Sequence, residues 1–154
     1  MQKLFRFALQ IGSRLSLNPS FIVQKRGRYF LLNANLGRFI SKNFYYAGTY
    51  LGKVKNGRFF PSFNLLMMLA KGEANKIVVG RKAAWLFICG RDVFWRGILS
   101  VRGSQKKGDH TLVLNKFGEC LGFGKILSNL NETAKRGVAV KNISDIGDFL
   151  RRET

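Results

Sequence analysis

The chain has 154 residues, of which 46% are hydrophobic, so it can form a sizeable core. Lys and Arg number 27 against 8 Asp and Glu, a formal net charge of +19, which is typical of proteins that bind polyanions. No stretch approaches the ~20 uninterrupted apolar residues of a membrane span, so the sequence predicts no transmembrane helix.

The charge is unevenly distributed along the chain. Residues 1–72 contain 12 Lys or Arg and no acidic residue, whereas the remaining residues contain 15 basic and all 8 acidic ones. This balance changes at the polar stretch 73–75. We therefore predict an N-terminal domain of residues 1–74 and a C-terminal domain of residues 75–154.

The acid-free half is predicted to be an α+β domain of antiparallel strands with helices against one face. Its first helix would bury a stripe formed by Leu4, Ala8, Ile11 and Leu15, although the same basic, amphipathic start is also typical of an organelle transit peptide. The expected strands are residues 21–24, 28–32, 45–54 and 58–60, with a possible short helix at 35–42 and a helix at 63–71 that begins at Ser62 and ends at Gly72. Pro61 is expected to end the fourth strand.

The second half is predicted to be rich in strands. Its expected elements are a strand at 76–79, a helix at 81–88, a strand reached through 92–101, a hairpin over 107–126, a strand at 138–141 and a short terminal helix capped by Ser144.

The hairpin has an unusual second strand. Simple alternation would put Glu119, Leu121, Phe123 and Lys125 on one face and Cys120, Gly122, Gly124 and Ile126 on the other. Two glycines on one face predict a close approach by another backbone, as in a small, tightly curved barrel.

The sequence predicts neither a metal site nor a cofactor. The chain contains two cysteines and one histidine, without the closely spaced pairs that zinc requires, so Cys89 and Cys120 are expected as reduced core thiols. The Gly122-x-Gly124 pair lacks the third glycine and the following helix of a dinucleotide-binding fingerprint.

Two motifs resemble signatures of the PUA domain, an RNA-binding β-barrel. One is Gly108-Asp109, an apolar strand, a turn and Leu121-Gly122-Phe123-Gly124; the other is residues 90–94 with Gly97-Ile98. Arg96 stands where the family usually has Pro, and His110 where it usually has Glu. Over residues 45–152, the segments 48–52, 59–62, 77–90 and 141–151 together resemble the Nip-seven family of ribosome-biogenesis proteins.

The resemblance implies that RNA meets the barrel near its first helix and its last strand. The candidate RNA-binding residues are then Arg81, Lys82, Lys135, Arg136 and Lys141. It also implies a monomeric, non-catalytic assembly factor of the large ribosomal subunit that binds pre-ribosomal RNA, the pre-ribosomal particle and other assembly factors. The archaeal branch, which this length resembles, would place it in the cytoplasm; a eukaryotic member would be nucleolar.

A second basic set lies at two predicted hairpin tips. It comprises Lys25, Arg26, Arg28, Lys53, Lys55 and Arg58. Charges at such positions often serve only to prevent edge-to-edge strand pairing. Because no acidic residue neutralises them locally, the sequence indicates equally well a binding surface for RNA or for an acidic partner.

An enzymatic function is not expected. Pseudouridine synthases and PUA-bearing transglycosylases need a catalytic carboxylate, which residues 1–72 cannot supply. Two alternatives stay open: an RNA-modification enzyme or its targeting subunit, and a ribosome-associated component of translation.

Overall fold

The computed structural model describes residues 1–40, 43–132 and 136–152. The helices are α1 (Gln2–Gln10), α2 (Ala34–Phe39), α3 (Phe63–Lys71), α4 (Arg81–Ile88) and α5 (Ile146–Arg152), with 3₁₀ turns η1 (Pro19–Phe21) and η2 (Trp95–Gly97). The strands are β1 (Ile22–Lys25), β2 (Arg28–Leu31), β3 (Thr49–Lys55), β4 (Arg58–Pro61), β5 (Lys76–Val79), β6 (Val93–Phe94), β7 (Ile98–Arg102), β8 (His110–Leu114), β9 (Cys120–Ile126) and β10 (Val138–Asp145).

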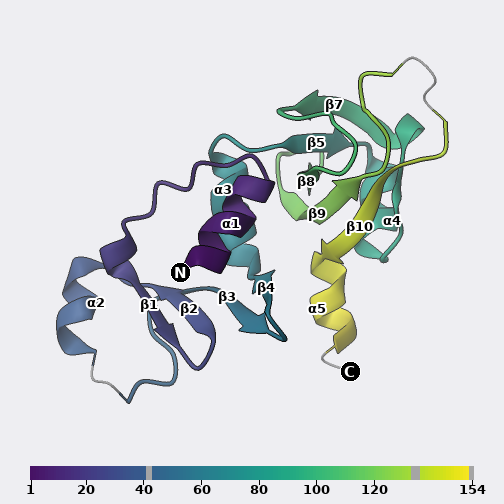
Figure 1. Cartoon of the computed structure of the whole chain (residues 1–154). Coiled ribbons are helices and arrows are strands. Elements are labelled where there is room, and N and C mark those ends of the chain that lie inside the picture. The colour runs from purple at the N-terminus through teal and green to yellow at the C-terminus, as the bar shows by residue number, and fades with distance from the viewer. Residues whose placement is uncertain (41–42, 133–135, 153–154) are drawn as a thin grey trace.

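The strands form two sheets, which confirms the predicted α+β class. The first is antiparallel, with the order β1-β2-β3-β4, and the second has the order β6-β10-β9-β8-β5-β7. Within the second sheet β5 and β8 run parallel, whereas the other neighbours are antiparallel. This sheet curves into a half-barrel, and α1 and α3 lie between it and the first sheet (Figure 1).

The two helices between the sheets create a core that both halves of the chain share. Phe7 of α1 packs edge-on against Phe123 of β9, with ring centroids 5.2 Å apart, and also contacts Phe59 of β4 at 5.6 Å. Leu65 of α3 and Leu112 of β8 are fully buried in the same cluster. The half-barrel therefore depends on the N-terminal helices to cover the apolar residues on one of its faces.

Asn75, at the predicted boundary, is buried and joins the two halves. Its backbone N–H donates to the Ile11 carbonyl, and its backbone carbonyl accepts from the Leu112 N–H. Its side-chain Nδ2 donates to the His110 carbonyl at 3.0 Å, while Oδ1 accepts from the Ser104 N–H at 2.8 Å. The polar residues at this point are thus part of the packed structure, and the boundary between residues 74 and 75 stays a prediction.

The close backbone approach predicted at the glycines of β9 is confirmed. A Cβ atom on Gly122 would overlap the Ser144 carbonyl oxygen, and one on Gly124 would overlap that of Lys141, both in β10. Simple alternation along β9 is wrong, however, because Leu114 pairs with Cys120 and Val113 with Gly122.

This bulge leaves Leu121 as an extra residue in β9 and reverses the faces on either side of it. As a result, Leu121 packs in the barrel core while Phe123 packs against the N-terminal helices.

The N-terminal elements follow their local signals with two corrections. Ser62 caps α3 by accepting from the Leu65 N–H at 3.2 Å, as predicted. The first helix ends at Gln10, before the positive φ of Gly12, so Leu15 is not part of its stripe, although it packs against the shared core. The strand β4 ends at Pro61, but Pro61 itself pairs with Gly52, so the ladder extends one residue beyond the predicted 58–60.

The last strand and helix also differ from the prediction. The strand continues to Asp145, so Ser144 lies within β10 and is not the helix cap. Instead, the Asp145 carboxylate accepts from the Asp148 N–H at 3.0 Å. The same carboxylate forms a salt bridge with Arg151 at 3.0 Å and accepts from Asn142 Nδ2 at 3.1 Å. A buried acid therefore fixes the direction of α5, because it needs several donors to offset its desolvation.

Candidate nucleic-acid interface

The predicted barrel residues lie on the surface wherever the structure describes them. Arg81 and Lys82 are the first two residues of α4, and both are exposed. Arg136 precedes β10, and Lys141 lies within it; these two are exposed as well. Lys135 lies outside the described residues.

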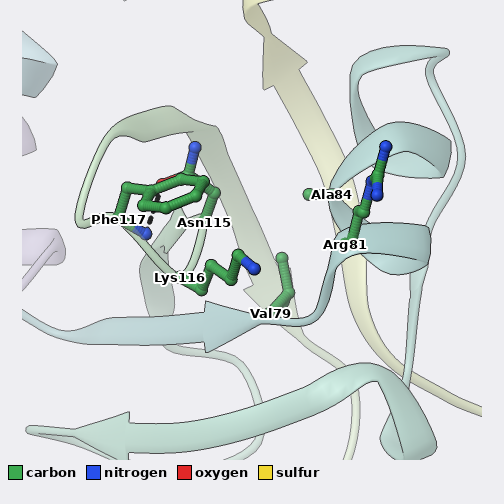
Figure 2. Close-up of a pocket in the computed structure, with 6 residues that line it drawn as sticks. All are labelled: Val79, Arg81, Ala84, Asn115, Lys116 and Phe117. Carbon is green, nitrogen blue, oxygen red and sulfur yellow. Dashed lines mark hydrogen bonds between the residues drawn. The ribbon is translucent and has the colours of Figure 1, made fainter.

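Arg81 lines a pocket of about 330 Å³ between the start of α4 and the β8–β9 hairpin. Figure 2 shows Arg81 and Ala84 on one side and the hairpin residues Lys116 and Phe117 on the other. Val79 and Asn115 complete the lining, so two cations and one aromatic ring face the pocket and no acidic side chain does.

Asn115 fixes the shape of the hairpin tip. Its Oδ1 accepts from the backbone N–H groups of Phe117 and Glu119, each at 3.0 Å, and its Nδ2 donates to the Glu119 carboxylate at 2.6 Å. Gly118 supplies the positive φ of +81° that closes the turn. This network orders the loop and leaves the Phe117 side chain 76% exposed.

The sequence identified this loop only as a turn, and so missed two of the residues that line the pocket. The Lys116 ammonium lies 5.1 Å from the centroid of the Phe117 ring. A signal was present in the sequence, because Phe117 is a large aromatic residue at a turn position, where small polar residues usually occur.

The pocket combines the chemical groups that bind a nucleotide. The first N–H groups of α4 have no side-chain cap, since the N-cap residue is Gly80, and a helix N-terminus attracts a phosphate. Arg81 and Lys116 can neutralise such a phosphate, and Phe117 offers a flat surface on which an unpaired base can stack.

Lys141 belongs to a second basic group, located away from this pocket. It pairs directly with Lys125 of β9, and Lys125 pairs with His110 of β8. Directly paired residues project from the same face, so the three side chains form a row across three strands. This row lies toward the end of β9 opposite the hairpin tip, and Lys125 is a member that sequence analysis missed because only strand pairing reveals it.

The position of His110 in this row changes its pKa. Burial, and then the charge of Lys125, lower the pKa of its imidazole, while Asp109 acts in the opposite direction with a smaller effect. The imidazole is therefore neutral near pH 7, and the positive charge of the row comes from its two lysines.

The second predicted basic set lies on the first sheet. Arg28 of β2 pairs with Lys25 of β1 on one side and with Lys53 of β3 on the other. Lys55 pairs with Arg58 across the β3–β4 hairpin, and Arg26 has a positive φ of 48° in the β1–β2 turn. These residues share one sheet, but nothing places them next to the barrel pocket.

The thiols differ from each other. Cys120 is buried, as predicted, and burial raises its pKa to about 11. Cys89 is exposed at the end of α4, so its assignment to the core is wrong.

Within the described ranges no three His, Cys, Asp or Glu side chains gather as metal ligands would. Nor does any helix in the described part of the chain have the length and apolar character to cross a membrane.

Comparison with known proteins assigns the chain to a family. The model described as UPF0113 PUA domain matches residues 75–154. A UPF0113 protein from Archaeoglobus fulgidus is 33% identical over 119 residues, which cover 72% of this chain and 64% of the relative. The chain thus spans less than two thirds of the length of this curated relative.

Solved archaeal structures share the fold over both halves. A conserved PUA domain protein from Thermoplasma acidophilum has a TM-score of 0.62 at 22% identity, covering 99% of this chain and 94% of that one. A hypothetical protein from Pyrococcus horikoshii has a TM-score of 0.63 at 20% identity, covering 99% and 93%. The fold therefore includes a PUA-type half-barrel. On the match to the family model and to the Archaeoglobus fulgidus relative, the chain belongs to the UPF0113 PUA domain family.

Proposed function

We propose that this protein binds RNA through its PUA half-barrel and acts without catalysis as an assembly factor for the large ribosomal subunit, as the resemblance to the Nip-seven family implies. In this role it would bind pre-ribosomal RNA as a monomer, together with other assembly factors. The archaeal origin of the relatives favours a cytoplasmic location.

The pocket between α4 and the β8–β9 hairpin is the observation that carries the proposal. It holds Arg81 and Lys116 on opposite sides, with an exposed aromatic ring beside them and no acidic lining residue. A site for a neutral small molecule would have mainly apolar walls, whereas two cations beside a stacking surface suit a nucleotide within a polyanion. The overall charge of +19 adds long-range attraction for such a partner.

The acidic residues support a binding role over a catalytic one, because several of them have structural partners. Asp145 holds α5, Asp109 accepts from the Ser104 hydroxyl, and Asp92 accepts from the Asn142 N–H at 2.8 Å. A catalytic carboxylate would instead need to face the site where a nucleoside binds.

RNA binding is tested by fluorescence anisotropy with full-length protein and labelled oligouridine. If about five phosphates are neutralised, log K should fall with log salt at a slope of roughly −3.5. Changing Arg81 and Lys116 together to Ala removes two cations, so the slope should become shallower by about 1.4 and the affinity should fall by about tenfold or more at low salt. A matched variant with Arg102 and Lys106 changed to Ala loses the same charge at the end of β7 remote from the pocket.

The result that supports the pocket is a much larger loss for the first variant than for the second. Equal losses of affinity in the two variants, or a flat salt dependence of the unchanged protein, would refute RNA binding at the pocket.

The wider role is tested separately by sedimentation of cell extracts at low and high salt. An assembly factor travels with precursor particles, a ribosomal component with mature subunits, and absence from every particle would reject both roles. Mass analysis of nucleosides after incubation with transcript tests for modification activity.

A further inference from the structure

The outer face of the four-stranded N-terminal sheet carries a surface that the barrel proposal leaves unused. The inner face packs on α1 and α3 through residues such as Ile22, Tyr29 and Leu51. On the outer face, α2 and the segment after it contribute apolar side chains that pack around Phe30. Among the described residues, the apolar cluster does not include the end of the outer face towards the hairpin turns.

A row of three cations and one aromatic residue crosses the four strands at this end. Lys25 pairs with Arg28, Arg28 with Lys53, and Lys53 with Phe60. Because directly paired residues project from the same face, three cationic side chains and one aromatic ring stand side by side. With neighbouring strands about 4.8 Å apart, the row extends over roughly 14 Å.

Such a row is unfavourable for folding, since like charges directly opposite one another in a sheet repel. No acidic residue occurs anywhere in residues 1–72 to relieve it. A row of like charges with no acidic residue in its own half of the chain attracts a polyanionic ligand.

Aromatic rings lie among these cations. Phe60, Tyr46 and Tyr45 are 42%, 58% and 75% exposed. The Arg28 guanidinium lies 5.5 Å from the Tyr45 ring centroid, and the Lys25 ammonium lies 4.6 Å from that of Phe44. Lys25 and Arg28 therefore each have a ring next to them, and Lys53 pairs with Phe60. Cations and rings in this combination bind the bases and phosphates of an unpaired strand.

The β3–β4 hairpin adds a hollow at the end of the row. A pocket of about 430 Å³ is lined by Lys55, Asn56, Arg58 and Phe60. Lys55 and Arg58 are directly paired, so both cations project on the side of the sheet that bears Phe60. The hollow thus repeats the chemistry of the barrel pocket, with two cations, an asparagine and a phenylalanine, on a different sheet.

We propose that this outer face, formed by Lys25, Arg28, Lys53, Lys55, Arg58 and Phe60 with Tyr45, is a second binding site, specific for single-stranded RNA. Phosphates lie along the cationic row and bases stack on the exposed rings. Four-stranded sheets with exposed aromatic residues bind two or three RNA bases in this manner in other RNA-binding proteins. An acidic protein partner would use the charges but would not need the rings. The site goes beyond the function proposed for the barrel and does not depend on it.

The test measures binding of labelled single-stranded RNA to full-length protein. The sheet variant changes the exposed residues Lys53, Lys55 and Arg58 to Gln, and a charge-matched control changes Arg6, Arg14 and Lys71 to Gln in the same acid-free half. The sheet variant should bind about tenfold more weakly, and its salt slope should be shallower by about 2, while the control should change much less. Urea unfolding of each variant checks that the fold is retained.

Stacking is tested by Phe60→Leu, which keeps an apolar side chain of similar volume but removes the ring. We expect about fivefold weaker binding to single-stranded RNA, and little effect on double-stranded RNA. All variants are also measured with Arg81 and Lys116 changed to Ala. If the barrel proposal fails, those two changes have no effect, but the sheet variant still loses affinity.

Three outcomes would overturn the second site: equal losses in the sheet variant and its control, no loss in either, or a loss in the sheet variant with unchanged binding by Phe60→Leu. The last outcome would indicate an acidic partner or purely electrostatic attraction.

Discussion

The close contact between Gly122 and β10 predicts that Gly122→Ala lowers the free energy of unfolding. Gly122 has a φ of +151°, a conformation that L-residues rarely adopt, and a Cβ atom there would overlap the Ser144 carbonyl oxygen and lie 3.0 Å from the Phe87 ring. The backbone conformation contributes about 1–3 kcal/mol and the overlap about 1–3 kcal/mol more. Gly122→Ala should therefore lower the free energy of unfolding by about 2–6 kcal/mol, a large part of the ~5–15 kcal/mol of a typical domain.

Two other glycines separate these contributions. Gly118 has a φ of +81° with nothing within 4 Å of its virtual Cβ atom, so Gly118→Ala tests backbone conformation alone, at about 1–2 kcal/mol. Gly124 has an ordinary φ, but its Cβ atom would overlap the Lys141 carbonyl and lie 2.5 Å from Val140 Cγ1. Gly124→Ala therefore tests overlap alone, at about 1–3 kcal/mol.

Urea denaturation followed by circular dichroism gives the three free energies of unfolding. The order should be Gly122→Ala as the most destabilised, with the other two variants intermediate between it and the unchanged protein. If Gly122→Ala is no less stable than Gly118→Ala, the close packing of β9 against β10 at this point is refuted.

Three further predictions concern single side chains. Because the folded-state pKa of His110 lies below its ordinary 6.5, neutral His110 is favoured in the native protein, so the stability that it contributes is present above about pH 6.5 and is lost as the pH falls. An NMR titration should give a midpoint below 6.5, and His110→Gln should reduce the loss of stability between about pH 7 and 5; a midpoint above 6.5 would contradict the effect of burial. Cys120, with its pKa raised to about 11 by burial, should resist a thiol reagent at neutral pH until the protein unfolds, whereas exposed Cys89 should react in the native state. Asp145→Ala should destabilise the protein by about 2 kcal/mol, since it removes the shared acceptor of Arg151 and the α5 backbone, and an unchanged urea midpoint would argue against that network.

Much of the fold could be predicted because its signals are local. Ser62 begins α3 and Asn56-Gly57 turns β3 into β4, since a capping hydroxyl and a residue pair suited to positive φ act within a few positions of the chain. The strand β5 and the helix α4 have the predicted bounds. In each case, the residues that determine the element lie inside it or next to it.

The features that could not be predicted depend on contacts and strand pairing between residues far apart in the sequence. In the shared core Phe7 packs against Phe123, and nothing in the sequence around either residue indicates that the two are in contact. The bulge at Leu121 arises from the register of β8 against β9, which alternation along one strand cannot reveal. Lys125 joins the basic row only because β9 pairs with β10 beside Lys141. The residues predicted from the PUA resemblance included Arg81 of the pocket, but not the Lys116 that lies across from it.

Ultraviolet crosslinking of full-length protein to uridine-rich RNA, followed by tryptic digestion and mass spectrometry, tests the central claim most directly. RNA binding at the barrel pocket predicts a nucleotide adduct on the peptide of residues 117–125, because Phe117 is the exposed ring at the pocket's edge. With Arg81 and Lys116 changed to Ala, trypsin no longer cleaves after residue 116, so the hairpin is recovered as the peptide of residues 108–125, and that peptide should carry no adduct. An added adduct near Phe60 would be consistent with the second site. Adducts confined to residues 1–72 in an RNA-bound sample would contradict the assignment of RNA binding to the barrel.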